Sequence, residues 1–177
     1  MKIQLTPLIA VAIVSILLFA IVFPDESRFR ISTCDHLKGF SMIRPIVKSP
    51  VLLSTPSVDA TPADAAVGQD LLDTLAAHAH ECVGLAANMI GVRKRVIVAA
   101  CAGGAVLMYN PEIVEASGEY QTEESCLSLE GSRLCTRYRR IKVAYLDASF
   151  TPCKKSFSGF DAQIVQHEID HCNGVVI

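Results

Sequence analysis

The chain has 177 residues, of which 51% are apolar, and a formal net charge of -2. This length supports one ordinary domain with a real core, and the charge provides no basic field for binding nucleic-acid phosphates. Seven cysteines form an odd set, and several lie inside apolar runs. We interpret most of them as small buried residues in a reducing compartment, not as a disulfide framework.

Residues 3–23 carry no charge and are nearly all apolar. They are long enough to cross a bilayer as a helix. We interpret them as a membrane anchor or as residues upstream of a true start at Met42, where the domain pattern begins, with a cleaved secretory signal as the third alternative. The basic residues that follow would keep the domain on the cytoplasmic side. We therefore expect a linker at 24–41, a catalytic domain at 42–177, and a cytoplasmic location with or without anchorage to the inner face of the membrane.

Residues 24–61 are interrupted by prolines and are predicted to form loop and edge strand. A helix is predicted from Thr61 to about His80. Thr61 can cap it, Pro62 suits the first helical position, and Asp64 completes a capping box. Apolar residues then recur at helical spacing.

Strand signals follow in the middle of the chain. The predicted strands are 95–100, 106–109 (ended by Asn110-Pro111), 112–122, 133–147 and 154–157. A last helix is predicted between a second capping box, Ser158 with Asp161, and a stop at Asn173-Gly174. Helix, strands and then helix predict an α+β fold.

The strongest chemical signal is His167-Glu168-Ile169-Asp170-His171 in this last helix. Residues four apart lie one above the other, so the two histidines face one point in space. Glu168 lies beside them, within reach of a water that a metal there would activate. Alone, this H-E-x-x-H pattern would suggest a zinc protease.

Two further segments argue against a protease. Glu124-Ser125-Cys126-Leu127-Ser128 offers a thiolate as third ligand, and soft sulfur favours iron(II) or zinc. The segment 82–91, with sequence CVGLAANMIG, is rich in small residues that let a substrate backbone approach an extended strand edge.

Together, in this order, the three segments resemble the peptide deformylase family from about Met42 to Ile177. The resemblance implies antiparallel strands packed around a central helix that bears the histidines. It also implies hydrolytic removal of the N-formyl group from the initiating methionine of nascent polypeptides. The family uses one divalent transition metal, usually Fe(II), with Zn(II) or Ni(II) as substitutes.

The resemblance also implies roles for individual residues. Cys126, His167 and His171 match the metal ligands, Glu168 the catalytic acid/base, and the Leu127 N–H a donor to the oxyanion. The segment of Gly84 and Leu85 matches the strand that pairs with substrate, and Met89 is the third substrate-binding candidate. Gln163 and Ile164 match the methionine pocket.

The departures concern the surroundings of the metal. Met89 stands where the family usually has a glutamine that helps to hold the reacting carbonyl, and losing an oxyanion donor typically costs about 10²–10³ in rate. Cys82 and Ser125 stand where glycine is common, which would cause strain if positive φ were required.

Three alternatives stay open: an impaired relative that binds formylated N-termini or a partner without turnover, a membrane-tethered metalloprotease, and a Cys–His thiol hydrolase. The expected partners are N-formylmethionyl nascent peptides. Transient ribosome association and membrane contact through residues 3–23 are further expectations, whereas direct nucleic-acid binding is not expected.

Overall fold

The computed structural model describes residues 42–177. The apolar segment 3–23 and the linker 24–41 lie outside the described residues. Within 42–177, no helix is long and apolar enough to cross a membrane. The six cysteines of this range are free thiols, three of them buried and three half-buried.

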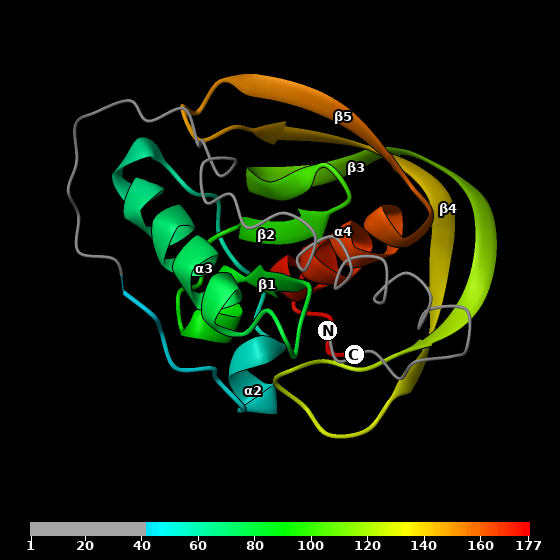
Figure 1. Cartoon of the computed structure of the whole chain (residues 1–177), viewed down its shortest axis with the longest axis horizontal. Helices are drawn as coiled ribbons and strands as arrows, with labels where there is room; N and C mark the ends of the chain where they lie inside the picture. The colour runs from blue at the N-terminus through cyan, green and yellow to red at the C-terminus, as the bar shows by residue number, and fades with distance from the viewer. Residues whose placement is uncertain (1–41) are drawn as a thin grey trace, which may run out of the picture. The chain divides into compact units, whose positions relative to one another are not determined.

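One antiparallel sheet of five strands organises the described part of the chain, with the strand order β1-β2-β3-β4-β5 (Figure 1). The strands are β1 (Gly84–Ala86), β2 (Val96–Cys101), β3 (Gly104–Glu124), β4 (Arg133–Leu146) and β5 (Pro152–Ser158). Each strand pairs with the next one along the chain. The predicted antiparallel strands are therefore confirmed, and β1 lies at one edge.

Of the helices in the described range, three precede the sheet in sequence, one lies between β1 and β2, and one follows β5. They are α2 (Pro50–Leu53), the 3-10 helix η2 (Pro62–Asp64), α3 (Ala65–Ala77), the 3-10 helix η3 (Ala87–Ile90) and α4 (Gly159–Cys172). The predicted start of the long helix is confirmed, because the Thr61 N–H donates to Asp64 Oδ2 at 2.8 Å. Before it, the predicted edge strand is reduced to one bridge between Val58 and Lys94.

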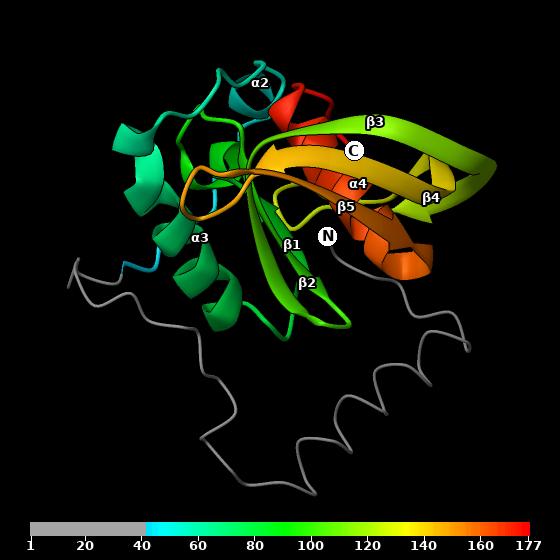
Figure 2. The same ribbon diagram turned by 90° about the horizontal axis from the view of Figure 1, so that it is seen from above.

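Helix α4 lies inside the curve of the long strands β3 to β5, and it also packs against β1 and β2 (Figures 1 and 2). Helix α3 contacts β2 from the other side of these two short strands. Residues Val96 to Ala99 of β2 are consequently all buried, as expected for a strand that is covered on both faces. This arrangement confirms the predicted α+β fold and places the histidine-bearing helix at its centre.

The prediction that Asn110-Pro111 ends a strand is wrong. Both residues lie within β3, where the register with β4 shifts between Tyr109 and Glu112. Asn110 has a φ of 51°, and its side-chain amide makes two hydrogen bonds with the backbone of Ala60, of 2.7 and 2.9 Å. The turn-forming pair therefore makes a bulge in a strand that continues.

The second predicted capping box is also wrong. Ser158 precedes α4 in an extended conformation, but its side chain makes no capping hydrogen bond. The Asp161 carboxylate instead accepts from the Ala102 N–H, at 3.2 and 3.3 Å. The predicted stop is confirmed: Gly174 has a φ of 75°, and the Val175 N–H after it closes the helix end.

Candidate metal centre

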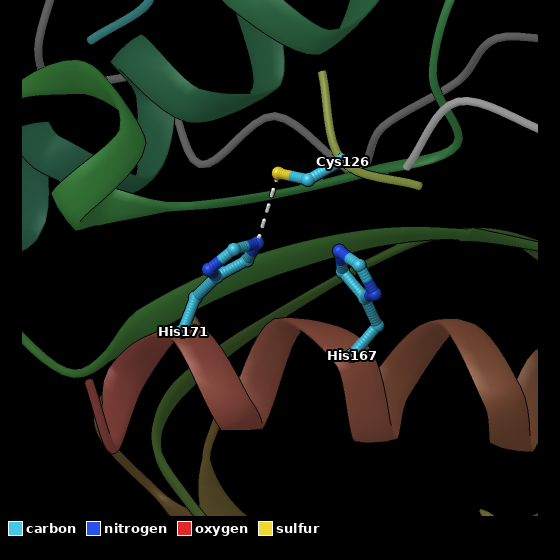
Figure 3. Close-up of side chains that lie close together, drawn as sticks. All are labelled: Cys126, His167 and His171. Atoms are coloured by element: carbon cyan, nitrogen blue, oxygen red, sulfur yellow. Dashed lines mark hydrogen bonds between the residues drawn. The ribbon is translucent and has the colours of Figure 1, made fainter. Parts of the chain in front are cut away.

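His167 and His171 lie one turn apart on α4 and face the same side of it (Figure 3). Their ring centroids are 4.8 Å apart, and the ring planes meet at 81°. Both side chains are fully buried, as is Glu168 between them in sequence. The helical spacing of four residues thus brings two imidazoles to one buried point.

Cys126 reaches this point from the loop that follows β3. Its Sγ atom lies 3.2 Å from His171 Nε2, and the three potential ligand atoms of Cys126, His167 and His171 all lie within 4.8 Å of one another (Figure 3). The Ser128 N–H also approaches the sulfur, at 3.4 Å. The structure therefore brings the three predicted ligands together, although Cys126 lies 41 residues before His167 and 45 residues before His171 in the sequence.

The donor set fits a tetrahedral transition metal. Metal–nitrogen bonds of about 2.1 Å and metal–sulfur bonds of about 2.3 Å place such donors roughly 3.3 to 3.8 Å apart. The Cys126–His171 pair, at 3.2 Å, is close to this range, and all three donors lie within 4.8 Å of one another. His167 Nε2 is buried and has no hydrogen-bond partner within the described residues. Three protein ligands leave a fourth position for the reacting groups, as catalytic sites require.

Glu124 and Arg137 fix His167 from the Nδ1 side of its ring, opposite the candidate metal position. The Glu124 carboxylate receives a hydrogen bond from His167 Nδ1 at 2.8 Å and two from the Arg137 guanidinium at 2.8 and 2.9 Å. Arg137 also binds Asp170 Oδ2 at 2.7 Å. Burial alone would raise the pKa of Glu124, but the contacts with His167 and Arg137 outweigh it and lower the pKa to about 2. This acid is therefore a carboxylate that fixes the ring of His167 with Nε2 toward the centre.

The pKa values of the two histidines are shifted in opposite directions. Burial would lower the pKa of His167, but its contacts with Cys126 and Glu124 raise it to about 9. Burial and the charge of His167 lower the pKa of His171 well below its usual value. The buried site thus favours a positive charge at His167, where a cation can replace the proton.

Glu168 lies against the edge strand. Its side chain is fully buried, and neither carboxylate oxygen has a hydrogen-bond partner within residues 42–177. Burial raises the pKa of Glu168. A carboxyl group whose pKa is shifted toward neutrality suits acid–base work.

Asn88 connects the segment 82–91 to helix α4, which carries the two histidines. Its Nδ2 donates to the backbone oxygen of His171 at 2.8 Å and to that of Leu53 at 3.4 Å. The sequence interpretation did not single out Asn88, Glu124 or Arg137. For Glu124 a signal was present, an acid two residues before a candidate ligand, whereas nothing near Arg137 marks it.

The departures from the family pattern lie in unstrained backbone. Cys82 and Ser125 are not among the non-glycine residues with positive φ, so the glycine common at those positions is not needed here for conformation. Burial raises the pKa of the Cys82 thiol to about 11, which keeps it neutral. Met89 is fully buried, and its Sδ accepts a hydrogen bond from the Ala86 N–H at 3.5 Å.

The remaining predicted residues differ in their burial and contacts. Leu85 and Ile164 are fully buried in the hydrophobic core. Gln163 is half-buried one turn before His167, and its Oε1 accepts from the Tyr120 hydroxyl at 3.1 Å. The Leu127 N–H makes no hydrogen bond within the described residues, so it can donate to a substrate oxygen.

Comparison with known proteins agrees with this geometry. Residues 43–177 match the family model of polypeptide deformylase. The chain is 52% identical over 136 residues to a peptide deformylase of Clostridium beijerinckii, which covers 77% of this chain and all of that protein. An actinonin-bound class I type b peptide deformylase from Acinetobacter baumannii has a TM-score of 0.69 at 32% identity, covering 77% of this chain and 96% of the other.

The peptide deformylase of Thermotoga maritima is similar at a TM-score of 0.68 and 30% identity, covering 76% of this chain and 95% of that one. The family match extends over the whole described range except its first residue. The chain therefore belongs to the peptide deformylase family, which makes it a metal-dependent deformylase.

Proposed function

We propose that this deformylase removes the formyl group from the N-terminal methionine of newly made polypeptides, with Cys126, His167 and His171 holding one divalent metal and Glu168 moving the proton. The single observation that carries the proposal is the convergence of a thiol and two imidazoles beside a buried carboxylate with no partner of its own within the described residues. The soft thiolate in the set favours Fe(II) or Zn(II) over magnesium or calcium, and the resemblance to the family implies Fe(II), with Zn(II) or Ni(II) as substitutes.

When bound, the metal supplies Lewis acidity, which polarises the formyl carbonyl and makes a water acidic enough to attack near neutral pH. Glu168 accepts a proton from the attacking water and delivers it to the departing amine nitrogen, so formate and a free N-terminus are released. The raised pKa of Glu168 supports both halves of this transfer, because the group must accept the proton and then give it up.

The Leu127 N–H is proposed to donate to the oxygen on which negative charge develops. It follows Cys126 directly, and no acceptor within residues 42–177 occupies it. A backbone donor that is already fixed in place stabilises such charge without reorganisation.

The substrate backbone is proposed to pair with the free edge of β1, that is, the edge that no strand of residues 42–177 pairs with. The Ala100 N–H donates to the Val83 oxygen at 2.8 Å, so Val83 and Leu85 direct their main-chain groups toward β2. By the alternation of antiparallel pairs, the N–H and C=O of Gly84 face the free edge. An extended peptide that adds to this edge would lie beside Glu168 and the metal. Gln163, one turn before His167, is proposed to line the pocket for the methionine side chain.

A direct test measures formate release from formyl-Met-Ala by protein purified without oxygen and loaded with Fe(II). The Glu168→Gln variant is the matched control, because it keeps the shape of the side chain but cannot take the proton. We expect the variant to retain its metal while kcat falls by about 10²–10⁴. Full activity of the variant would remove Glu168 from the mechanism, and an inactive wild-type protein with a full metal site would refute the function.

The alternative functions are not favoured. A metalloprotease needs only the histidine helix, whereas here the Cys126 loop and the β1 segment join the same site. An impaired binding protein was suggested by Met89, Cys82 and Ser125. Cys82 and Ser125 have no positive φ, and the donor that Met89 cannot supply is tested by the Met89→Gln variant. Ribosome association and membrane contact stay predictions from the sequence.

A further inference from the structure

We infer that Gly84 is a positioning residue for Glu168: the hydrogen in place of a side chain leaves the space that the carboxylate occupies. The inference rests on the proposed role of Glu168. A Cβ atom built on Gly84 would lie 2.5 Å from Glu168 Oε1 and 2.9 Å from both its Cδ and Cγ. Real Cβ atoms essentially never approach other atoms so closely, so the two side chains cannot both be accommodated.

The backbone conformation does not explain this glycine. Gly84 is not among the glycines with positive φ, and it lies in a strand paired with β2. Any residue can adopt such an extended conformation. The need for glycine therefore comes from the space beside Glu168, and not from the freedom of the chain.

Glu168 cannot simply move aside. It is fully buried on α4, and three successive atoms of its side chain would meet the added methyl group, not only the flexible end. Helix α4 is itself packed against β1, β2 and β4. An alanine at position 84 must therefore push the carboxylate out of place or push β1 away from α4.

This contact links the two tasks proposed for the site. The residue whose main-chain groups face the free edge of β1 also touches the side chain proposed to move the proton. The contact between Gly84 and Glu168 thus fixes the distance from the strand edge that pairs with the peptide to the carboxylate that moves the proton. Misplacement of a reacting group by about 1 Å can cost about 10²-fold in rate.

The first experiment compares Gly84→Ala with Gly103→Ala in the metal-loaded enzyme, with formyl-Met-Ala as substrate. Gly103 is the matched control, because a Cβ there meets nothing within 4 Å and its φ is not positive. We expect Gly84→Ala to lose about 10²-fold in kcat while KM stays within about threefold and metal content is unchanged. Gly103→Ala should behave as wild type. A Gly84→Ala variant with wild-type kcat would overturn the inference.

The second experiment needs no turnover. The unfolding midpoint is measured for Gly84→Ala, Glu168→Ala and the double variant, since removing the carboxylate arm removes all three contacts. We expect Gly84→Ala to destabilise the protein in the presence of Glu168 and to have little effect in the Glu168→Ala background. An equal loss in both backgrounds would overturn the inference.

The two experiments also separate this inference from the proposed function. A wild-type protein that releases no formate would refute the function, and the unfolding measurements would still decide whether Gly84 and Glu168 compete for space. If Gly84→Ala does not fold, a folded double variant supports the inference and an unfolded one overturns it.

Discussion

Glu124 Oε2 lies 2.8 Å from His167 Nδ1, and through this contact the acid determines which nitrogen of the ring faces Cys126 and His171. The same carboxylate binds Arg137 on β4. One buried ion pair, Glu124 with Arg137, thus connects three parts of the site. These are the end of β3 before the Cys126 loop, strand β4 and helix α4. Metal-ligating histidines are commonly oriented in this way, which raises the basicity of the ligand.

Glu124→Gln is expected to lower metal affinity by about 10- to 100-fold, because a neutral amide orients the His167 ring but polarises it less. Competition with a chromophoric chelator measures the change. Glu115→Gln is the matched control, since Glu115 also lies on β3 and pairs with Lys142, but it is exposed. Equal affinities for the two variants would show that the carboxylate charge of Glu124 does not reach the metal.

Acid should destabilise the metal-free protein through Glu124. Its folded pKa is lowered from 4.5 to about 2, so the unfolded chain binds this proton more readily than the folded one. The resulting stabilisation is complete above about pH 4.5 and is lost as the pH falls toward 2, to a total of roughly 3 kcal/mol. Urea unfolding with chelator present, at several pH values below 5.5, should show a shallower decline for Glu124→Gln than for wild type. Parallel declines would contradict the prediction.

Local sequence patterns predicted most of the fold. The spacing of apolar residues located α3, and Asn173-Gly174 gave the end of α4 correctly. Asn110-Pro111 misled the strand prediction, because the amide of Asn110 binds the backbone of Ala60, 50 residues away. Tertiary contacts of this kind can override local turn chemistry, and no local pattern reveals them.

The candidate site was predictable to a different extent at each residue. His167 and His171 follow from helical spacing alone, whereas Cys126 is one of seven cysteines, and its segment became a strong signal only together with the resemblance to a family. Arg137 and Asn88 were missed, because each acts through a partner that is distant in sequence: Asp170 is 33 residues from Arg137, and His171 is 83 residues from Asn88. The sequence indicated candidate ligands and a candidate proton carrier more readily than the groups that hold them in place.

Met89→Gln is expected to leave kcat unchanged or to raise it. Glutamine has a similar length, its oxygen can replace Sδ as acceptor for the Ala86 N–H, and its amide adds a donor near the reacting carbonyl. The added amide is buried, so the free energy of unfolding should fall by about 1–3 kcal/mol where the amide finds no partner. Steady-state kinetics and urea unfolding measure the two effects.

Met89→Leu is the control for this substitution, since it removes the acceptor and adds no donor. It should not raise kcat. A large loss of kcat in Met89→Gln would show that the thioether itself positions the substrate.

Asn88→Ala should weaken both the fold and the metal site. The side-chain amide of Asn88 satisfies the backbone oxygens of His171 and Leu53, and the first of these belongs to the last turn of α4. The Leu53 oxygen would lose its side-chain donor, at a cost of about 1–3 kcal/mol for a buried acceptor, whereas the His171 oxygen would keep the Gly174 N–H at 3.2 Å. A looser last turn would no longer hold His171 in register with Cys126. Urea unfolding and chelator competition should both register the change. Gln69→Ala removes an exposed amide contact to Asp73 on α3 and should stay within about 0.5 kcal/mol of wild type. If Asn88→Ala matches that control in both measurements, the amide does not hold the backbone of His171.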